Sequence, residues 1–167
     1  MEIKKISISF EEYNEGEELS PSDSTLIDEA VIALDGSYAP YSNFHVGAAL
    51  LMEDGEIIKG SNQENAAYPS GLCAERVAIF YANAKYPGKS IDSIAITVKA
   101  DHFKTNGPVT PCGACRQVIA ETEKRQNKKI RIIMKGDSGS TRIVDGIENL
   151  LPMMFHEEKL MKKKPNI

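Results

Sequence analysis

The chain has 167 residues, of which 41% are hydrophobic and 26% are charged, and its formal net charge is −4. This length suits one domain with a hydrophobic core. No apolar run approaches the roughly 20 residues of a membrane span, and the negative charge argues against a surface that binds a nucleic acid polymer through its phosphates. The first ten residues lack the apolar stretch of a secretory signal. We therefore expect a cytoplasmic protein with neither a membrane nor a polynucleotide partner.

Residues 1–19 have the composition of an N-terminal extension. Polar and apolar residues alternate over Ile3–Phe10, and an acidic stretch follows that includes Glu11, Glu12, Glu17 and Glu18. Alternation is typical of an edge strand, whereas the acidic stretch is typical of a mobile linker, so the sequence leaves both alternatives open. A single folded domain is predicted to begin at residue 20 and to run to residue 167.

Helices and strands follow one another along the rest of the chain. Ser20-Pro21 predicts a helix start, because Ser is favoured as an N-cap and Pro in the first turn, and Gly36 predicts its end. Further helices are predicted at 73–86, 112–126 and 147–151, and strands at 45–52, 56–59, 94–98, 130–134 and 142–144. Asp54-Gly55 predicts a hairpin between the first two strands. This order predicts an α/β fold, a three-layer α/β/α sandwich with a five-stranded mixed sheet.

Cys73, Cys112 and Cys115 are the three cysteines of the chain, and each lies at or near a predicted helix start. Cys112 and Cys115 are three residues apart, which puts both sulfurs on one helix face. Glu75 follows two residues after Cys73. Three protein ligands, an open fourth position and a nearby carboxylate are the arrangement of a catalytic zinc site. We therefore predict that the three cysteines bind Zn²⁺ and that Glu75 moves protons.

Two arginines stand beside the predicted ligands. Three thiolates and Zn²⁺ sum to a charge of −1, which would make a bound water less acidic. Arg76 and Arg116 are placed to donate hydrogen bonds to the sulfurs and to offset this charge, and Arg76 is the better candidate because it lies one turn from Cys73.

Cys-x-x-Cys also occurs in redox pairs and in structural zinc sites, so these remain alternatives. A structural site would need a fourth Cys or His at short spacing, and His45, His102 and His156 form no such pair with the cysteines.

Three further segments carry a family resemblance. Together with the two cysteine segments, Tyr38–Leu50, Asn62–Tyr68 and Leu150–Phe155 resemble the small homotetrameric type of cytidine deaminase, and the likeness covers about residues 21–160. The resemblance implies hydrolytic deamination of cytidine and deoxycytidine to uridine and deoxyuridine. In that family zinc-bound hydroxide attacks C4, and Glu75 would be the proton shuttle.

The resemblance also implies which residues bind the substrate. Asn62 and Glu64 would hydrogen-bond the 3′ hydroxyl of the ribose, and Phe44 would pack on the base. Phe155 would stack in the site of a neighbouring subunit, and Tyr68 would also cross the interface. The implied assembly is a homotetramer with shared active sites.

The chain departs from the family pattern in its first nineteen residues, at Gln63, where an apolar residue is expected, and at Met153-Met154, where small residues are usual. Three rival functions are a deaminase of a base-modified nucleoside such as blasticidin S, a polynucleotide cytosine deaminase and a non-catalytic protein with a structural zinc. Asn62 and Glu64 favour cytidine and deoxycytidine over the first, and the net charge of −4 with an acidic N-terminus argues against the second. The third predicts a closed fourth coordination position and tolerance of Glu75→Gln.

Overall fold

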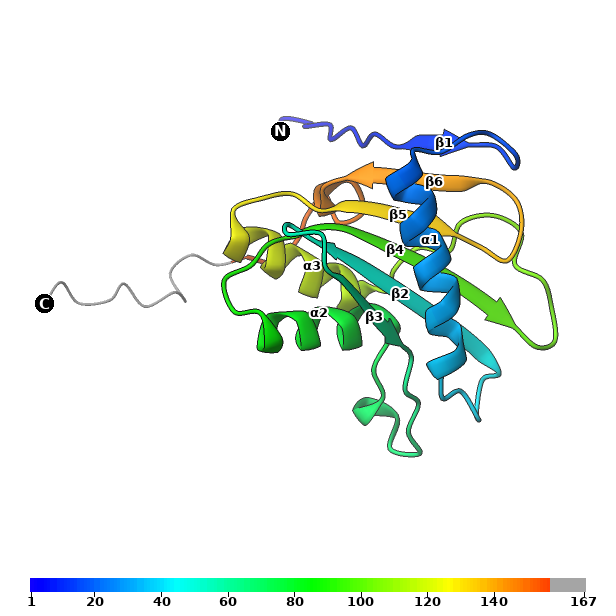
Figure 1. The fold of residues 1–167 in the computed structure, drawn as a ribbon. Coiled ribbons are helices and arrows are strands. Elements are labelled where there is room, and N and C mark those ends of the chain that lie inside the picture. The colour runs from blue at the N-terminus through cyan, green and yellow to red at the C-terminus, as the bar shows by residue number, and fades with distance from the viewer. Residues whose placement is uncertain (157–167) are drawn as a thin grey trace, which may run out of the picture.

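The computed structural model describes residues 1–156 and shows a six-stranded mixed sheet with helices on both faces (Figure 1). The strands are β1 (Glu11–Tyr13), β2 (Phe44–Met52), β3 (Ile57–Ser61), β4 (Ile91–Ala100), β5 (Arg131–Lys135) and β6 (Thr141–Asp145), in the spatial order β1-β6-β5-β4-β2-β3. The helices are α1 (Pro21–Ala33), α2 (Ala74–Lys85) and α3 (Gly113–Gln126), with 3₁₀ turns at Leu34–Gly36, Tyr68–Ser70 and Ile147–Asn149. Only the β4–β5 pair is parallel among these strands, because α3 carries the chain across between them. The predicted α/β sandwich is confirmed.

The sheet has one strand more than the five predicted. The additional strand, β1, belongs to the N-terminal extension and pairs with β6, with Glu11 opposite Ile143 and Tyr13 opposite Thr141. It falls in the acidic stretch and not in the alternating segment Ile3–Phe10, which contains no strand. The pairing depends on arginines far along the chain: Arg131 bonds Glu11, and Arg142 bonds Glu12. The predicted helix at 147–151 is the 3₁₀ turn at Ile147–Asn149.

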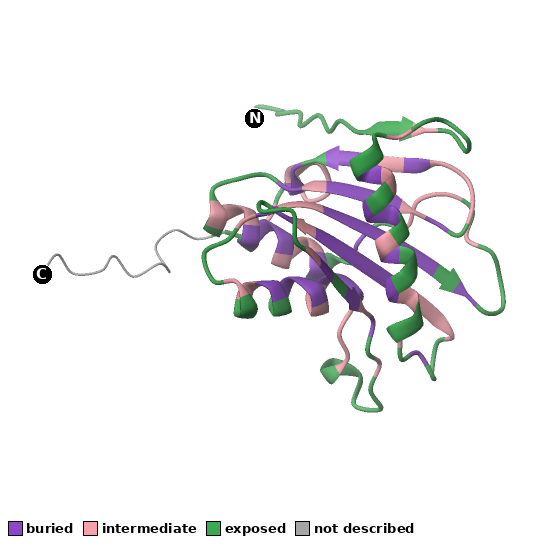
Figure 2. Cartoon of the chain, in the orientation of Figure 1, coloured by how far each residue is buried: buried purple, intermediate pink, exposed green. Residues whose placement is uncertain are grey.

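Two apolar layers hold the helices on the sheet, and the buried residues line the strands on both faces (Figure 2). On one face α1 packs Leu26, Ile27 and Ala30 against the strands. On the other face α2 and α3 bury a larger cluster that includes Ile79 and Ile119. Helix α1 begins as predicted, since Ser20 Oγ accepts a hydrogen bond from Asp23 N at 3.1 Å.

Helices α2 and α3 lie on the same face of the sheet and begin with cysteines. Cys73 is the N-cap of α2 and Cys112 is the N-cap of α3. Helix α2 sits close on β3 because Gly60 has no side chain: a Cβ there would lie 2.6 Å from Ala74 O. The fold therefore brings the two cysteine segments together over one end of the sheet.

Within residues 1–156, no helix combines the length and apolar character that crossing a membrane requires.

Candidate active site

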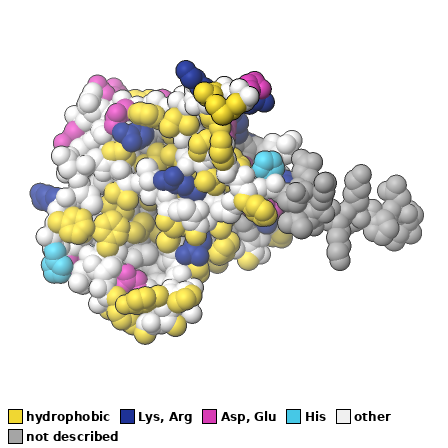
Figure 3. Space-filling view, turned by 180° about the vertical axis from the view of Figure 1, so that it is seen from behind, with side chains coloured by type: hydrophobic (Ala, Val, Ile, Leu, Met, Phe, Trp, Pro, Cys, Tyr) yellow, Lys and Arg dark blue, Asp and Glu magenta, His cyan; other side chains and the backbone are white. Residues whose placement is uncertain are grey.

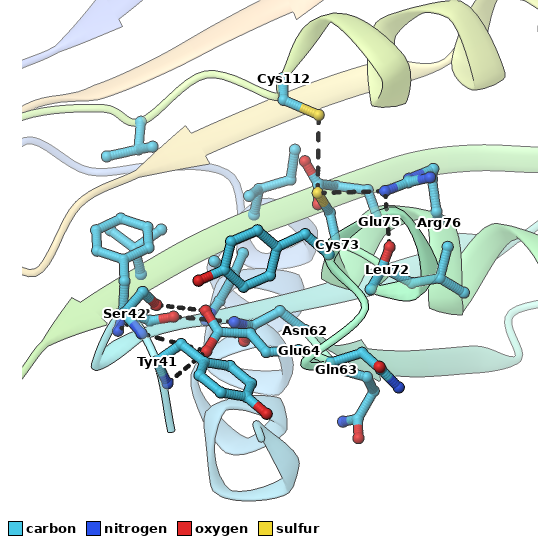
Figure 4. Close-up of a pocket in the computed structure, with 18 of the residues that line it drawn as sticks. Tyr41, Ser42, Asn62, Gln63, Glu64, Leu72, Cys73, Glu75, Arg76 and Cys112 are labelled. Carbon is cyan, nitrogen blue, oxygen red and sulfur yellow. Dashed lines mark hydrogen bonds between the residues drawn. The ribbon is translucent and has the colours of Figure 1, made fainter. Parts of the chain in front are cut away.

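A cavity of about 820 Å³ opens where α2 and α3 begin (Figure 4). Cys73, Cys112 and Glu75 line one end of it, and Tyr41 and Glu64 line the other. The walls between these ends are largely apolar, and they include Leu72, Val46, Ile96, Val98 and Val109. Such a cavity, apolar with a few polar groups at fixed places, is typical of a small-molecule site.

The structure brings the three cysteines together although 39 residues separate Cys73 from Cys112. The Cys73 and Cys112 sulfurs are 3.7 Å apart, and those of Cys112 and Cys115 are 3.4 Å apart. All three sulfurs lie within 4.8 Å of one another. All three cysteines are free thiols.

The cluster has the dimensions of a zinc site. Tetrahedral bonds of about 2.3 Å from one zinc ion place two sulfurs roughly 3.8 Å apart, close to the distances between these cysteines. Within the described chain no fourth Cys, His, Asp or Glu joins the cluster. Zinc bound here would therefore have three protein ligands, and one position would stay open toward the cavity, as a catalytic site requires.

Electrostatics favour a thiolate at Cys73. Hydrogen bonds to the Cys73 sulfur lower its pKa to about 5. The largest contribution comes from the Cys115 thiol, and the Arg76 guanidinium adds to it. The Arg76 guanidinium lies 3.8 Å from Cys73 Sγ and also bonds Gly71 O at 3.4 Å. The contact with Cys73, together with burial, raises the pKa of Cys115, so the first negative charge of the metal-free cluster lies on Cys73. The helix N-termini add to this preference.

Glu75 is the acidic group beside the cluster. It stands in the first turn of α2, and only 3% of its surface is exposed. One of its oxygens, Oε2, is buried and has no hydrogen-bond partner among the described residues. Burial raises the pKa of Glu75. A buried carboxylate with a free oxygen on a cavity wall is placed to exchange protons with a molecule in that cavity.

The second arginine does not do what the sequence suggested. Arg116 donates to Pro111 O at 2.8 Å, to Leu150 O at 2.8 Å and to Thr110 Oγ1 at 2.9 Å, and none of these hydrogen bonds goes to a sulfur. Its guanidinium therefore links the loop at Thr110 and Pro111 to the segment at Leu150. Arg76 alone of the two lies on a cysteine sulfur.

The other end of the cavity is built around Glu64. Its carboxylate accepts hydrogen bonds from Tyr41 N at 2.9 Å, from Ser42 N at 3.2 Å and from Ser42 Oγ at 2.5 Å. The hydrogen bond from the Ser42 hydroxyl lowers the pKa of Glu64, and with the backbone N–H groups of Tyr41 and Ser42 it outweighs burial, which acts in the opposite direction. Glu64 is therefore a fixed carboxylate, and its remaining lone pairs can accept from a hydroxyl group.

Asn62 is buried below Glu64 and is tied to strand β2. Its Oδ1 accepts from Val46 N at 2.8 Å, and its Nδ2 donates to Phe44 O at 2.9 Å. The amide thus extends the pairing of β2 beyond the end of β3. Both Asn62 and Glu64 line the cavity, as predicted for one binding segment.

Three aromatic residues were predicted to meet the substrate, and the structure separates them. Phe44 and Tyr68 line the cavity, and Tyr68 is 76% exposed and packs edge-on against Tyr41, with ring centroids 6.1 Å apart. Phe155 lies elsewhere, beside α3, where Gln117 Nε2 bonds its carbonyl oxygen. Its ring is 69% exposed and does not line the cavity of its own chain.

Residues 20–130 match the family described as the cytidine and deoxycytidylate deaminase zinc-binding region. The chain belongs to this family. It is 46% identical to a cytidine deaminase of Halalkalibacterium halodurans over 81% of this chain and 95% of the relative, and 46% identical to one of Sporosarcina psychrophila over 81% and 92%. The crystal structure of a cytidine deaminase from Burkholderia pseudomallei is similar, with a TM-score of 0.69 and 40% identity over 79% of this chain and 98% of that one.

Several residues of the site were not singled out from the sequence. Ser42 fixes Glu64, and Thr110 holds the guanidinium of Arg116. Phe103 stacks on Phe44, with ring centroids 6.2 Å apart and an interplanar angle of 23°. Ser42 lies within the segment that carried the family resemblance, so its position was a usable signal. The sequence carries no signal for Phe103, because the residues around it show no helical or strand pattern of apolar side chains.

Proposed function

We propose that this chain deaminates cytidine and deoxycytidine hydrolytically, giving uridine or deoxyuridine and ammonia. The observation that carries the proposal is the buried, partly unpartnered carboxylate of Glu75 beside three clustered sulfurs, in the same cavity as Asn62 and Glu64. Cys73, Cys112 and Cys115 would hold zinc, which when bound supplies Lewis-acid activation of water for attack at C4 of the pyrimidine.

The proton transfers fall to Glu75. We assign it to take a proton from the attacking water, to pass it to ring nitrogen N3, and to help the amino group leave as ammonia. Its raised pKa fits both tasks, because a carboxylate that burial makes more basic than an ordinary glutamate is a better proton acceptor and can donate the proton again once it holds it. Arg76 would offset the negative charge of the sulfurs through its contact with Cys73.

Asn62 and Glu64 would place the sugar. Glu64, fixed by Ser42 and the backbone, would accept from the 3′ hydroxyl, and Asn62, which keeps a second amide hydrogen besides the one on Phe44 O, would donate to the same hydroxyl. A free base would offer no hydroxyl to the remaining lone pairs of Glu64 or to the second amide hydrogen of Asn62, so the proposal favours a nucleoside. Phe44 would pack on the base from the same chain.

The glutamine variant of Glu75 tests the chemistry. Glu75→Gln keeps the shape but cannot accept a proton, so it should retain zinc and lower kcat by about 10²- to 10⁴-fold. Turnover is followed by the near-ultraviolet absorbance change of cytidine, and zinc by elemental analysis. Glu121→Gln, an exposed glutamate of α3, is the matched control and should keep full activity.

Two results would oppose the proposal. Unchanged turnover in Glu75→Gln would remove its assigned role. Inactivity of the zinc-loaded wild-type protein toward cytidine would redirect the search to base-modified nucleosides, and then to a structural zinc.

We also propose that the protein is a homotetramer with shared active sites. The exposed rings of Tyr68 and Phe155, and the distance of Phe155 from its own cavity, support this. Co-expression of Glu75→Gln with Phe155→Ala offers a direct test. Each variant alone should be weak, but mixed assemblies contain sites with Glu75 from one subunit and Phe155 from another, so activity should be partly restored. No restoration in verified mixed assemblies would argue that each site uses one chain.

The cytoplasm is the location we propose. Three closely spaced cysteines that are to bind a metal must stay reduced, and the reducing cytoplasm favours this.

A further inference from the structure

The N-terminal extension projects from the fold. Residues 1–10 run from β1 past the end of β6 (Figure 1), and the side chains of Ile3, Ile6, Ile8 and Phe10 are 49% to 78% exposed. Within residues 1–156, one hydrogen bond ties this segment to the rest of the chain, from Ser9 N to Asn149 Oδ1 at 2.9 Å. Figure 3 shows the molecule from behind. At its top, where the N-terminal segment lies, apolar and charged side chains stand next to one another on the surface. Exposed apolar side chains that recur along an extended segment are a typical feature of an interaction surface.

The extension is anchored at one end only. Glu11 bonds Arg131 at 3.0 Å and Glu12 bonds Arg142 at 2.8 Å, while the ring of Phe10 lies 4.5 Å from the Arg142 guanidinium. Strand β1 pairs with β6 on one side and is the edge of the sheet on the other. Its outer edge, continued by residues 3–10, is therefore open to another strand.

We propose that residues 3–13 pair antiparallel with the same segment of a second copy of this chain, about a two-fold axis at Ile8. The pairs opposite one another would be Ile3 with Tyr13, Lys4 with Glu12, Lys5 with Glu11, Ile6 with Phe10, Ser7 with Ser9, and Ile8 with Ile8. Every apolar residue meets an apolar residue, every lysine meets a glutamate, and serine meets serine. Such cross-strand pairs stabilise a ladder, whereas like charges opposite each other destabilise it.

The neighbouring registers lack this complementarity. A two-fold axis perpendicular to the sheet pairs residues of the same face, so the register can shift only in steps of two. An axis at Ser7 would place Lys4 opposite Phe10 and Glu2 opposite Glu12. An axis at Ser9 would place Ile6 opposite Glu12. The sequence pattern therefore selects Ile8 as the centre.

The ion pairs that Glu11 and Glu12 make within the chain do not prevent the proposed pairs with lysines of a second chain. The side chains of Glu11 and Glu12 remain 44% and 41% exposed. Each carboxylate can accept from an arginine of its own chain and a lysine of the other. A lone two-stranded ribbon is only marginally stable, so we place this contact within a larger assembly, as the proposed homotetramer provides. The proposed strand pairing therefore rests on the proposed homotetramer and does not depend on the proposed deamination.

Cysteine substitution at the axis tests the pairing in the zinc-loaded full chain. Ile8→Cys puts two thiols directly opposite each other, so mild oxidation should give a disulfide-linked dimer on a non-reducing gel. Ile6→Cys is the matched control: its two copies would lie four residues apart along the ladder, roughly 13 Å, beyond the reach of a disulfide. Equal crosslinking of both variants, or of neither, would overturn the proposal. Stronger crosslinking of Ser7→Cys or Ser9→Cys would overturn the register.

Charge reversal tests the complementarity separately. In the Ile8→Cys background, Lys4→Glu with Lys5→Glu places four acidic pairs in the ladder and should slow crosslinking at least tenfold. Lys124→Glu with Arg125→Glu makes the same charge change on α3 and should leave the rate unchanged. Equal rates in the two variants would contradict the pairing. Cytidine turnover, measured alongside, reports on the proposed function independently.

Discussion

Gly60 sets how closely helix α2 approaches the sheet, and its replacement by alanine should damage the site from a distance. A Cβ at this position would lie 2.6 Å from Ala74 O, 2.7 Å from Ala78 N and 2.9 Å from Ala78 Cβ. Two of these atoms belong to the helix backbone and cannot rotate away. Helix α2 would have to retreat by several tenths of an ångström, and it carries Cys73 at its N-cap and Glu75 in its first turn.

The size of the effect follows from this displacement. Overpacking of a tight core contact costs about 1–3 kcal/mol, and a domain of this size loses roughly 2–4 °C in Tm per kcal/mol. A misplacement of about 1 Å at a catalytic group can cost roughly 100-fold in rate. We therefore expect Gly60→Ala to lower Tm by several degrees and kcat by about tenfold to a hundredfold, even with zinc in excess.

The assay is thermal unfolding with parallel cytidine kinetics and zinc analysis. Gly113→Ala is a matched control, because a Cβ there meets nothing within 4 Å although the residue adjoins Cys112. It should leave stability unchanged or slightly raised, since alanine favours the helix. The reasoning is refuted if Gly60→Ala unfolds and turns over as the wild-type protein does, or if Gly113→Ala is equally damaged.

Three further variants test other contacts. Arg76→Ala should slow turnover more than it lowers the free energy of unfolding, measured by kinetics and chemical denaturation, because its guanidinium acts on a sulfur. Asn62→Ala leaves a backbone N–H of β2, that of Val46, without its acceptor, so it should cost about 1–3 kcal/mol in denaturation experiments. The hydrogen bond from Arg131 lowers the pKa of Glu11. The ion pair therefore stabilises the fold above the ordinary glutamate pKa of about 4.3, and this stabilisation is lost as the pH falls through the lowered pKa. Glu11→Gln should therefore make the free energy of unfolding depend less on pH in the acid range.

Each expectation has an outcome that contradicts it. An unaltered rate in Arg76→Ala would discard the charge-offset argument, and Arg76→Lys should preserve part of the rate if charge is what matters. Full stability in Asn62→Ala would mean that water replaces its bonds. A profile for Glu11→Gln that parallels the wild-type profile would mean that β1 does not depend on its ion pair.

The zinc cluster was predictable because its chemistry demands particular residues at short spacing. Cys112 and Cys115 share one helix turn, and Glu75 follows Cys73 in another, so each half of the site is local. The helix starts were predictable for a similar reason, as Ser20 shows with its hydrogen bond to Asp23 N. Such signals extend over a few residues and are visible in the sequence.

Long-range pairing left no comparable signal. Strand β1 is three residues long and acidic, and arginines about 120 to 130 residues away determine where it pairs. Arg116 is closer in sequence to a cysteine than Arg76 is, but it donates its hydrogen bonds to the carbonyl oxygens of Pro111 and Leu150. When several acceptors lie within reach of a side chain, the tertiary structure determines which of them it bonds. The spacing of residues along the chain does not reveal this.

Strand β3 links the two ends of the cavity and sets their separation. Gly60 holds α2, and with it Cys73 and Glu75, against the sheet, and the chain then continues directly into Asn62 and Glu64. The end of the cavity that carries Cys73 and Glu75 and the end that carries Glu64 are thus fixed to one short piece of backbone. The distance between C4 of the base and the 3′ hydroxyl of a nucleoside depends on its glycosidic torsion and sugar pucker, so a rigid link of this kind would select one conformer and position both groups at once. This is the physical reason to expect that a change at Gly60 will alter catalysis even though Gly60 does not line the cavity.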